Sequence, residues 1–236
     1  GRFDKILDIK KCWLQDEPSN SIRLWVKEYA VKHELTFFDL REQNGFLRNL
    51  IIRTSTNGEV MCVFAFAKED KEKREALLNA FHEVFHQVNS LMYVINDKRN
   101  DTIGDLEIEI YHGADHIVEE MPSYDREKTL KFKIGPKSFY QTNSEQAHTL
   151  YHLAADFAEI KKDEMVYDLY TGTGTIAQFI ASQAKEVIGI EYVEAAIEDA
   201  KINAEVNEIE NTRFFAGDMK DIFTPAFLKK HGNADV

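Results

Sequence analysis

The stretch from Val166 to Thr175, Val-Tyr-Asp-Leu-Tyr-Thr-Gly-Thr-Gly-Thr, limits the fold of this chain more than any other part of its sequence. It begins as a short apolar strand and runs into a turn with Gly172 and Gly174, after which apolar residues recur at helical spacing up to residue 180. Two closely spaced glycines let the backbone turn tightly and approach a ligand, and the following helix directs free N–H groups at that turn. This order predicts the nucleotide-binding corner of a parallel α/β sheet.

Asp168 bears on which cofactor this corner holds. The run Gly172-x-Gly174-x-x-Ala177 fits the dinucleotide fingerprint, which is a weak signal by itself. A buried parallel strand is expected to be apolar throughout, and a carboxylate within it needs hydrogen-bond donors or a positively charged ligand. S-adenosylmethionine carries a sulfonium and an amino group, whereas NAD carries a pyrophosphate that an acidic strand repels. We therefore predict S-adenosylmethionine, with NAD as the alternative.

Two more acidic residues follow the next expected strands. Glu191 ends the apolar run 187–190, about 20 positions after the first glycine, where a carboxylate accepts both ribose hydroxyls of a nucleoside. Asp218 follows the strand expected from residue 212, and at its carboxyl end the side chain can reach the adenine edge of a cofactor. The alternatives are a solvated glutamate at a strand end and an aspartate in a turn.

Composition describes a soluble globular protein. The 236 residues are 44% hydrophobic and 30% charged, with no apolar run near the ~20 residues that span a bilayer and no signal peptide. Cys12 and Cys62 cannot form a disulfide framework, so we expect a cytoplasmic protein. We also expect a monomer with no membrane partner. The net charge of −12 opposes non-specific binding to nucleic acid, so an RNA partner requires a local basic face or a segment outside this chain.

The pattern along the chain predicts two domains, an α+β domain at 1–125 and a parallel α/β domain at 126–236. Asn57-Gly58 predicts a hairpin between strands 46–54 and 60–67, and Ser21 is a candidate helix cap. The break in pattern and charge at 119–128, which contains Pro122, marks the expected linker. Further elements are expected as a helix at 68–89, strands at 91–96, 106–111 and 130–134, and a helix capped by Asn143 or Ser144.

The helix at 68–89 also carries His82-Glu-Val-Phe-His86, the two-histidine pattern of zinc hydrolases. Both histidines fall on a polar stripe of the helix, and a zinc site requires at least one more ligand, which no pattern singles out. We favour a solvated helix face and keep a zinc hydrolase as an alternative.

From about Thr129 onward the sequence resembles the RNA uracil-C5 methyltransferases that act on ribosomal or transfer RNA. The segment Phe139-Tyr140-Gln141-Thr142-Asn143 is similar to the Gln-x-Asn segment of that family, Val166–Thr175 to its first cofactor motif and Gly189-Ile190-Glu191 to its second. Its spacing is also followed by Ala200, Asn203-Ala204, Asn207, Asn211 and the segment from Phe214 to Asp218. The expected fold is the N-terminal half of a Rossmann-like S-adenosylmethionine-dependent methyltransferase sheet, preceded by a smaller α+β domain.

The resemblance also implies roles for single residues. It implies that S-adenosylmethionine is contacted by Gln141, Tyr170, Thr175, Glu191 and Asp218. Together with Asp168, Gly172 and Gly174 of the turn, these residues make up the predicted cofactor site. It places Phe139 near the RNA pocket, and we add Arg48 and Arg53 as candidate RNA contacts, with exposed strand arginines as the alternative. Cys12 resembles the last of four cysteines that hold a four-iron cluster in some members, whose other three would lie upstream of this chain. Thr171 stands where many members have a cysteine.

Such enzymes work by covalent catalysis: a cysteine adds to uracil C6, C5 takes the methyl group, and a base then removes the C5 proton. Neither Cys12 nor Cys62 fits the place of that nucleophile, and the resemblance puts an Asp-Pro-Pro-Arg-type motif, the nucleophile and the base beyond Val236. We therefore expect the parent protein to methylate uracil C5 in RNA, with 23S rRNA favoured, and this chain alone to transfer no methyl group and to bind the cofactor weakly. The alternatives are an NAD-dependent oxidoreductase, a zinc hydrolase and, for residues 1–125, a non-catalytic RNA-binding module.

Overall fold

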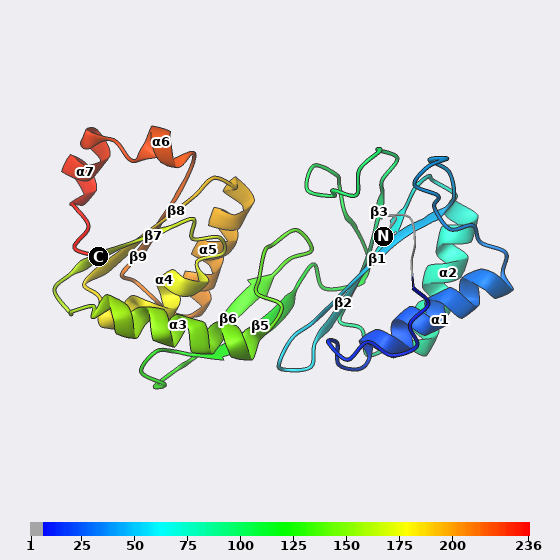
Figure 1. Ribbon diagram of the computed structural model, residues 1–236, viewed down its shortest axis with the longest axis horizontal. Helices are drawn as coiled ribbons and strands as arrows, with labels where there is room; N and C mark the ends of the chain where they lie inside the picture. Colours follow the sequence, from blue (N-terminus) through cyan, green and yellow to red (C-terminus); the bar gives the residue numbers. More distant parts are fainter. Residues whose placement is uncertain (1–6) are drawn as a thin grey trace. The chain divides into compact units, whose positions relative to one another are not determined.

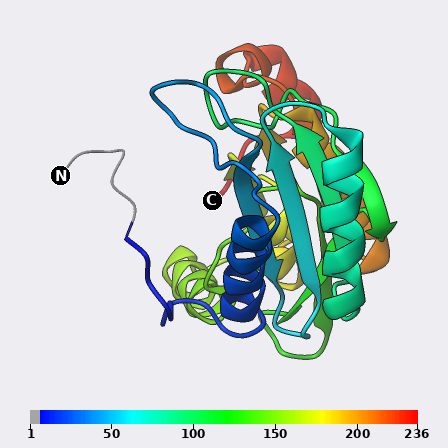
Figure 2. The same ribbon diagram turned by 90° about the vertical axis from the view of Figure 1, so that its right-hand side faces the viewer.

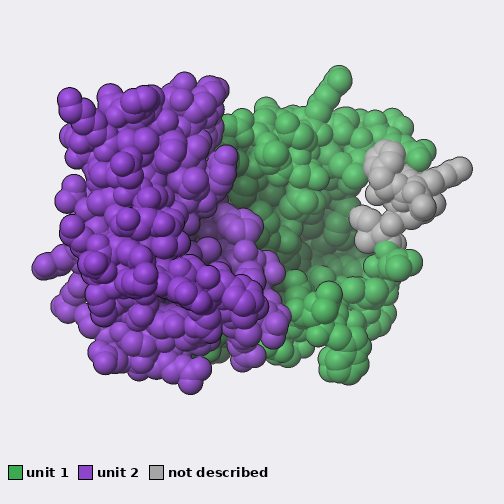
Figure 3. Space-filling model, turned by 60° about the vertical axis from the view of Figure 1, so that its left-hand side comes forward, with its two compact units in different colours: residues 1–117 green, residues 118–236 purple. Residues whose placement is uncertain are grey.

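The structure is a computed structural model that describes residues 7–236 and divides into two compact units, 1–117 and 118–236 (Figure 3). The division lies earlier in the chain than the domain boundary predicted between residues 125 and 126. The expected linker at 119–128 is wrong, because β5 (Ile117–Pro122) pairs with β6 (Thr129–Ile134) across this stretch. The Ser123 N–H donates to the Lys128 carbonyl, which closes the turn of this hairpin.

The first unit is a mixed sheet with helices on one face (Figure 1). Its strands follow the order β1-β2-β3-β4, in which β2 and β3 are parallel and the outer pairs antiparallel. Figure 2 shows α1 and α2 in front of the sheet, running roughly along its strands. The elements are α1 (Ser19–Lys32), β1 (Leu47–Thr54), β2 (Val60–Phe66), α2 (Lys71–Val84), β3 (Ser90–Ile95) and β4 (Glu109–Gly113).

The predicted hairpin of this unit is confirmed. Thr54 and Val60 are partners in the β1–β2 register, and Gly58 takes the left-handed conformation that the turn requires. All seven residues of β2 are buried, as expected for a central strand. Cys62 and Phe64 on one face of β2 pack with α1 and α2 in a common core.

Two helix predictions for this unit need correction. Ser21 does not cap α1, which begins at Ser19 after Pro18; Ser21 instead donates its N–H and hydroxyl to the Glu17 carboxylate. The helix expected at 68–89 is shorter, because the Asp70 side chain caps its start by accepting from the Lys73 N–H and the helix ends at Val84.

The second unit holds a parallel sheet in the order β7-β8-β9 together with the β5–β6 hairpin. Its core joins the inner face of α3 to the sheet and to α5, with Phe132, Phe179 and Phe214 among the buried members. The remaining elements are α3 (Ser144–Ala158), β7 (Met165–Leu169), α4 (Thr175–Ile180), a 3₁₀ turn at Ala181–Gln183, β8 (Glu186–Glu191), α5 (Glu194–Val206), β9 (Thr212–Ala216), α6 (Met219–Ile222) and α7 (Pro225–His231).

The last residues of the chain extend this sheet beyond β7. The Met165 carbonyl accepts from the N–H groups of Asp235 and Val236, and the Tyr167 N–H donates to the Val236 carbonyl. Both compact units therefore combine helices with sheets, and the helices of the described residues are all too short or too polar to cross a membrane.

Candidate cofactor site

The glycine turn after β7 is fixed to the neighbouring strand by its backbone. The N–H groups of Tyr170 and Thr171 both donate to the Ile190 carbonyl, at 2.8 and 3.1 Å. Tyr170, Gly172 and Gly174 have φ values of 65°, 58° and 77°, so the chain reverses sharply over a few residues. This geometry places the start of α4 beside the carboxyl ends of β7 and β8.

Asp168 holds the turn from inside. Its Oδ2 accepts from the Thr171 hydroxyl at 2.6 Å and from the Ala177 N–H, in the first turn of α4, at 3.1 Å. Burial raises the pKa of the Asp168 carboxyl, the two hydrogen bonds lower it, and the nearby Glu191 charge raises it further. In dinucleotide-binding folds the helix N-terminus receives the pyrophosphate, whereas here a carboxylate occupies an N–H group of that turn. The site is therefore better suited to a cationic nucleoside than to NAD.

Glu191 reaches the same turn from the end of β8. Its Oε2 accepts from the Gly172 N–H at 3.2 Å and its Oε1 from the Val193 N–H at 3.0 Å. Each oxygen retains acceptor capacity, since a carboxylate offers about four lone-pair positions. Asp168 and Glu191 thus both bond the glycine turn, as the sequence predicts, and this pair of acceptors fits S-adenosylmethionine.

The glycines of the turn do different work from one another. A Cβ on Gly174 would lie 2.8 Å from the Phe214 ring and 3.0 Å from the Ala200 Cβ, so this glycine is required by the protein's own packing. A Cβ on Gly172 would meet nothing within 4 Å. Gly172 therefore has the open space that the predicted approach of a ligand needs, whereas Gly174 packs against Phe214 of β9 and Ala200 of α5.

The other predicted cofactor contacts are not all assembled at this corner. Thr175 is buried beside Thr173, Tyr170 is 74% exposed, and Gln141 lies exposed on the loop between β6 and α3. The Asp218 carboxylate caps α6 by accepting from the Lys220 N–H, and the Lys220 side chain holds the pKa of Asp218 low. In this structure Asp218 is thus engaged as a turn aspartate, the alternative noted for it.

Arg48, one of the two arginines predicted to contact RNA, has its hydrogen-bond partners within the first unit. The Arg48 guanidinium donates to the carbonyls of Asn96 and Asn100, each at 2.8 Å, and to Asp101 Oδ1, and its side chain is 1% exposed. Arg48 therefore clamps the loop after β3. Burial lowers the pKa of Arg53, which is half-buried on the same strand.

The part of the chain that the structure describes does not bring the metal-ligand candidates together. Among residues 7–236 no three His, Cys, Asp or Glu side chains gather in a way that could hold a metal ion. The rings of His82 and His112 are tilted by 40° to each other with their centroids 3.9 Å apart, and His86 lies beyond the end of α2. The backbone N–H and carbonyl of Cys12 are both bonded to the Asn20 side chain.

Sequence reasoning assigned no structural role to a row of polar side chains on α5 and at its end, although two of them follow the spacing of the family. Asp199, Asn203 and Asn207 recur at a spacing of four on one face of this helix, so they lie one above the other. Asn207 bonds the N–H and carbonyl of Lys131, and Asn203 accepts from the Lys133 N–H, so that α5 binds the backbone of β6. The i, i+4, i+8 spacing of polar residues on a helix that faces a sheet is the signal that could have revealed them.

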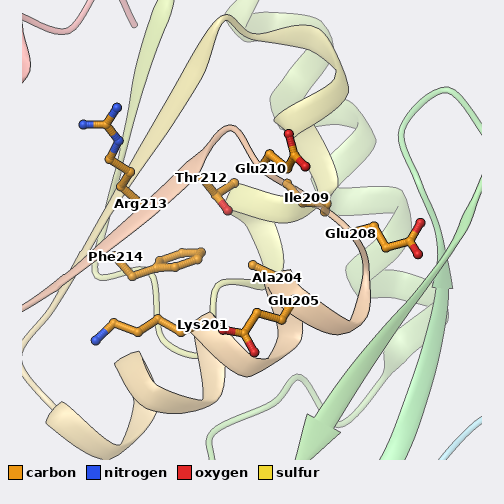
Figure 4. Close-up of a pocket in the computed structure, with 9 residues that line it drawn as sticks. All are labelled: Lys201, Ala204, Glu205, Glu208, Ile209, Glu210, Thr212, Arg213 and Phe214. Atoms are coloured by element: carbon orange, nitrogen blue, oxygen red, sulfur yellow. The ribbon is translucent and has the colours of Figure 1, made fainter.

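The structure also contains a cavity of about 540 Å³ at the amino end of β9 (Figure 4). Because the strands are parallel, this is the end of the sheet opposite to Glu191 and the glycine turn. The cavity is thus separate from the cofactor corner. It is lined by Lys201, Ala204, Glu205, Glu208, Ile209, Glu210, Thr212, Arg213 and Phe214.

Comparison with known proteins identifies the class of this fold. A family model described as a methyltransferase domain matches residues 160–236, which contain the glycine turn and Glu191. The fold is similar to that of Pyrococcus abyssi tRNA (uracil-54, C5)-methyltransferase, with a TM-score of 0.75 and 24% identity over 97% of this chain and 58% of the other. Fold and site together define a Rossmann-like domain of the S-adenosylmethionine-dependent methyltransferases, as predicted, and S-adenosylmethionine is the cofactor of that class.

Relatives narrow this class further. The chain is 55% identical to a protein of Bacteroides thetaiotaomicron and 56% identical to one of Porphyromonas gingivalis, both named uncharacterized RNA methyltransferases. Both matches cover 100% of this chain but 51% and 50% of the relatives, so the chain spans about half the length of the curated relatives it matches. Over its whole length the chain is therefore similar to proteins named RNA methyltransferases.

Proposed function

We propose that this chain carries the cofactor-binding part of an enzyme that transfers a methyl group from S-adenosylmethionine to C5 of uracil in RNA, with 23S rRNA as the favoured substrate. The observation that carries the cofactor part is the pair of carboxylates, Asp168 and Glu191, on one glycine turn. The names of the relatives support RNA as substrate. The Pyrococcus abyssi enzyme of similar fold is named for uracil C5 and was crystallised with S-adenosylhomocysteine, which supports the position of methylation.

The residues of the corner would share the work of binding. When bound, the cofactor supplies an electrophilic methyl group on a sulfonium. Glu191 would accept the ribose hydroxyls, while Asp168 would offset the positive charge and keep the turn closed. Gln141, Tyr170, Thr175 and Asp218 remain proposed contacts, the last after release of its carboxylate from Lys220. The exposed ring of Phe139 would stack on an unpaired base.

Neither of the chain's two thiols suits the role of the nucleophile in covalent catalysis. Burial raises the pKa of Cys62 to about 12, so the thiolate that adds to uracil C6 does not form there at neutral pH. Cys12 remains a proposed ligand of an iron–sulfur cluster in a longer parent protein. The nucleophile and the base are accordingly assigned by this proposal to residues outside the chain.

Substitution of Glu191 tests the cofactor assignment. Glu191→Gln removes the charge but keeps one acceptor, and we expect the Kd for S-adenosylhomocysteine in calorimetry to rise about ten-fold or more, since hydrogen bonds to charged groups contribute about 1.5–3 kcal/mol. The matched control is Glu186→Gln at the opposite end of β8, where Glu186 pairs with Arg213. Equal affinities of the two variants, or NADH binding more tightly than S-adenosylhomocysteine, would contradict the assignment.

A further inference from the structure

The loop between β6 and α3, residues 135–143, carries Phe139 and Gln141 and is anchored at its start by α5. Ser138 is buried, and its hydroxyl donates to Asp199 Oδ2 at 2.6 Å while accepting from the Gly135 N–H at 3.0 Å. Asp199 belongs to the helix that directly follows Glu191. A charge-assisted bond of this length is among the stronger hydrogen bonds in proteins, so the loop is tied to the element next to the cofactor corner.

The far end of the loop has a second carboxylate anchor. The Asn143 side chain caps α3 by accepting from the Gln146 N–H, and the Ser144 hydroxyl donates to Glu119 Oε2 at 3.1 Å. Glu119 is 2% exposed, on β5. Between these two anchors Phe139 is 73% exposed, whereas Tyr140 packs against the core of the second unit beside Phe132.

Asn203, one helical turn beyond Asp199, joins this region to the glycine turn itself. Its Oδ1 accepts from the Lys133 N–H at 2.7 Å, in the strand that leads into the loop, and its Nδ2 donates to the Thr173 carbonyl at 3.3 Å. Asn203 is fully buried, so an unpaired polar group there would be costly. The helix α5 therefore fixes the glycine turn and the base of the loop in one frame.

We propose that Asp199 is a positioning residue of the methyltransferase site, which through Ser138 holds the 135–143 loop at the distance from the glycine turn at which Gln141 meets the cofactor. The inference rests on the proposed function, because the loop needs a ligand at the turn to act upon. Asp199 itself contacts neither cofactor nor RNA in this proposal. Its effect is carried by the hydrogen bond from the Ser138 hydroxyl and by α5, whose Asn203 holds the glycine turn.

The experiment compares hydrogen exchange of the loop and cofactor affinity in variants of the full 236-residue chain. Asp199→Ala is expected to speed exchange of the amides at 138–143 about ten-fold and to raise the Kd for S-adenosylhomocysteine about five-fold or more, without changing exchange in β8. Asp199→Asn, which keeps an acceptor for Ser138, should restore most of both. Glu198→Ala, at an adjacent exposed residue of α5 paired with Lys201, is the control and should change neither.

The Ser138→Ala variant gives the same test from the other side of the bond. If the contact carries the effect, the double variant Ser138→Ala/Asp199→Ala should be no worse than either single variant. Additive effects, or loop exchange in Asp199→Ala equal to that of Glu198→Ala, would overturn the proposal. If the proposed function is wrong, S-adenosylhomocysteine will leave the exchange of residues 168–177 unchanged in the unmodified chain. The comparison of loop exchange without ligand still decides the role of Asp199 in that case.

Discussion

At the scale of single residues, the electrostatics of the site centre on the Asp168 carboxyl. Two donors meet one of its oxygens, but burial and the Glu191 charge still raise its pKa above the ordinary value of 3.8. The folded protein therefore shifts this carboxyl toward its neutral form relative to an exposed aspartate, and a ligand with a positive charge would shift it back toward the ionised form. Asp168 therefore makes the folded state sensitive to pH and to the charge of the ligand.

The stability of the chain should therefore depend on pH through Asp168. Because the folded-state pKa is raised, the unfolded chain releases the Asp168 proton at lower pH than the folded chain, so the contribution of Asp168 is complete below pH 3.8 and is lost as pH rises through the folded-state pKa. Asp168→Asn keeps an acceptor for Thr171 and Ala177 but cannot ionise. In urea unfolding the stability of this variant relative to the unmodified chain should therefore increase as pH rises across that window, and a constant difference would contradict the assigned shift.

The case of Arg48 shows how a side chain's partners override its position in the sequence. An arginine on an expected strand predicts an exposed cation, and the RNA contact predicted for Arg48 requires such exposure. In the fold its guanidinium is nearly inaccessible and satisfies carbonyls of the loop after β3. Those carbonyls lie about fifty positions away along the chain, so no local pattern in the sequence indicates the pairing.

At the scale of elements, the strand–turn–helix unit at 165–180 combines two kinds of glycine. Gly174 leaves room for the Phe214 ring, as does Gly189 on the neighbouring strand β8, where a Cβ would lie 2.6 Å from that ring. Gly172 faces open space next to the Glu191 carboxylate. The turn is therefore built partly by packing against β9 and partly for access.

These two glycines give a matched pair of substitutions. Gly174→Ala adds overpacking against Phe214 to the cost of a left-handed backbone, and we expect a loss of about 3 kcal/mol in the free energy of unfolding. Gly172→Ala should cost only about 1 kcal/mol, from its backbone conformation. Urea unfolding measures both, and equal losses would show that the turn does not pack as described.

At the scale of the whole molecule, the chain holds two separate cores, one in each compact unit. The proposed cofactor contacts all belong to residues 118–236. The net charge of −12 leaves the attraction of RNA to local basic groups rather than to the chain as a whole. Each unit is therefore stabilised by its own core, and a ligand is proposed for the second unit alone.

Ligand protection should accordingly be confined to the second unit. With S-adenosylhomocysteine at ten times its Kd, we expect exchange of the slowest amides in β8 to slow about ten-fold, as mass action requires for a ligand that binds only the folded state. The amides of β2, at Cys62 and Phe64, should exchange at an unchanged rate. Equal slowing in both strands, measured by mass spectrometry of peptic peptides, would show that the units unfold together.

The sequence predicted much of this fold because its signals are local. The Asn57-Gly58 hairpin, the cap at Asn143 and the glycine turn each depend on backbone preferences of a few neighbouring residues, and each is present in the structure. The stretch 119–128 failed as a linker because charge and Pro122 mark irregular chain, whereas pairing of β5 with β6 depends on a partner that the local pattern does not contain.

The sequence by itself determined the class of the protein, since a carboxylate in an apolar strand, two close glycines and an acidic strand end define the chemistry of a cationic nucleoside site wherever they fold. The tertiary structure decided which side chains are engaged within the protein itself. In the fold Gly174 packs against Phe214, Arg48 donates to carbonyls of a distant loop and Asp199 accepts from the Ser138 hydroxyl. The physical reason is that hydrogen bonds and steric contacts act over a few ångströms in space, so partners far apart along the chain become known only when the fold brings them together.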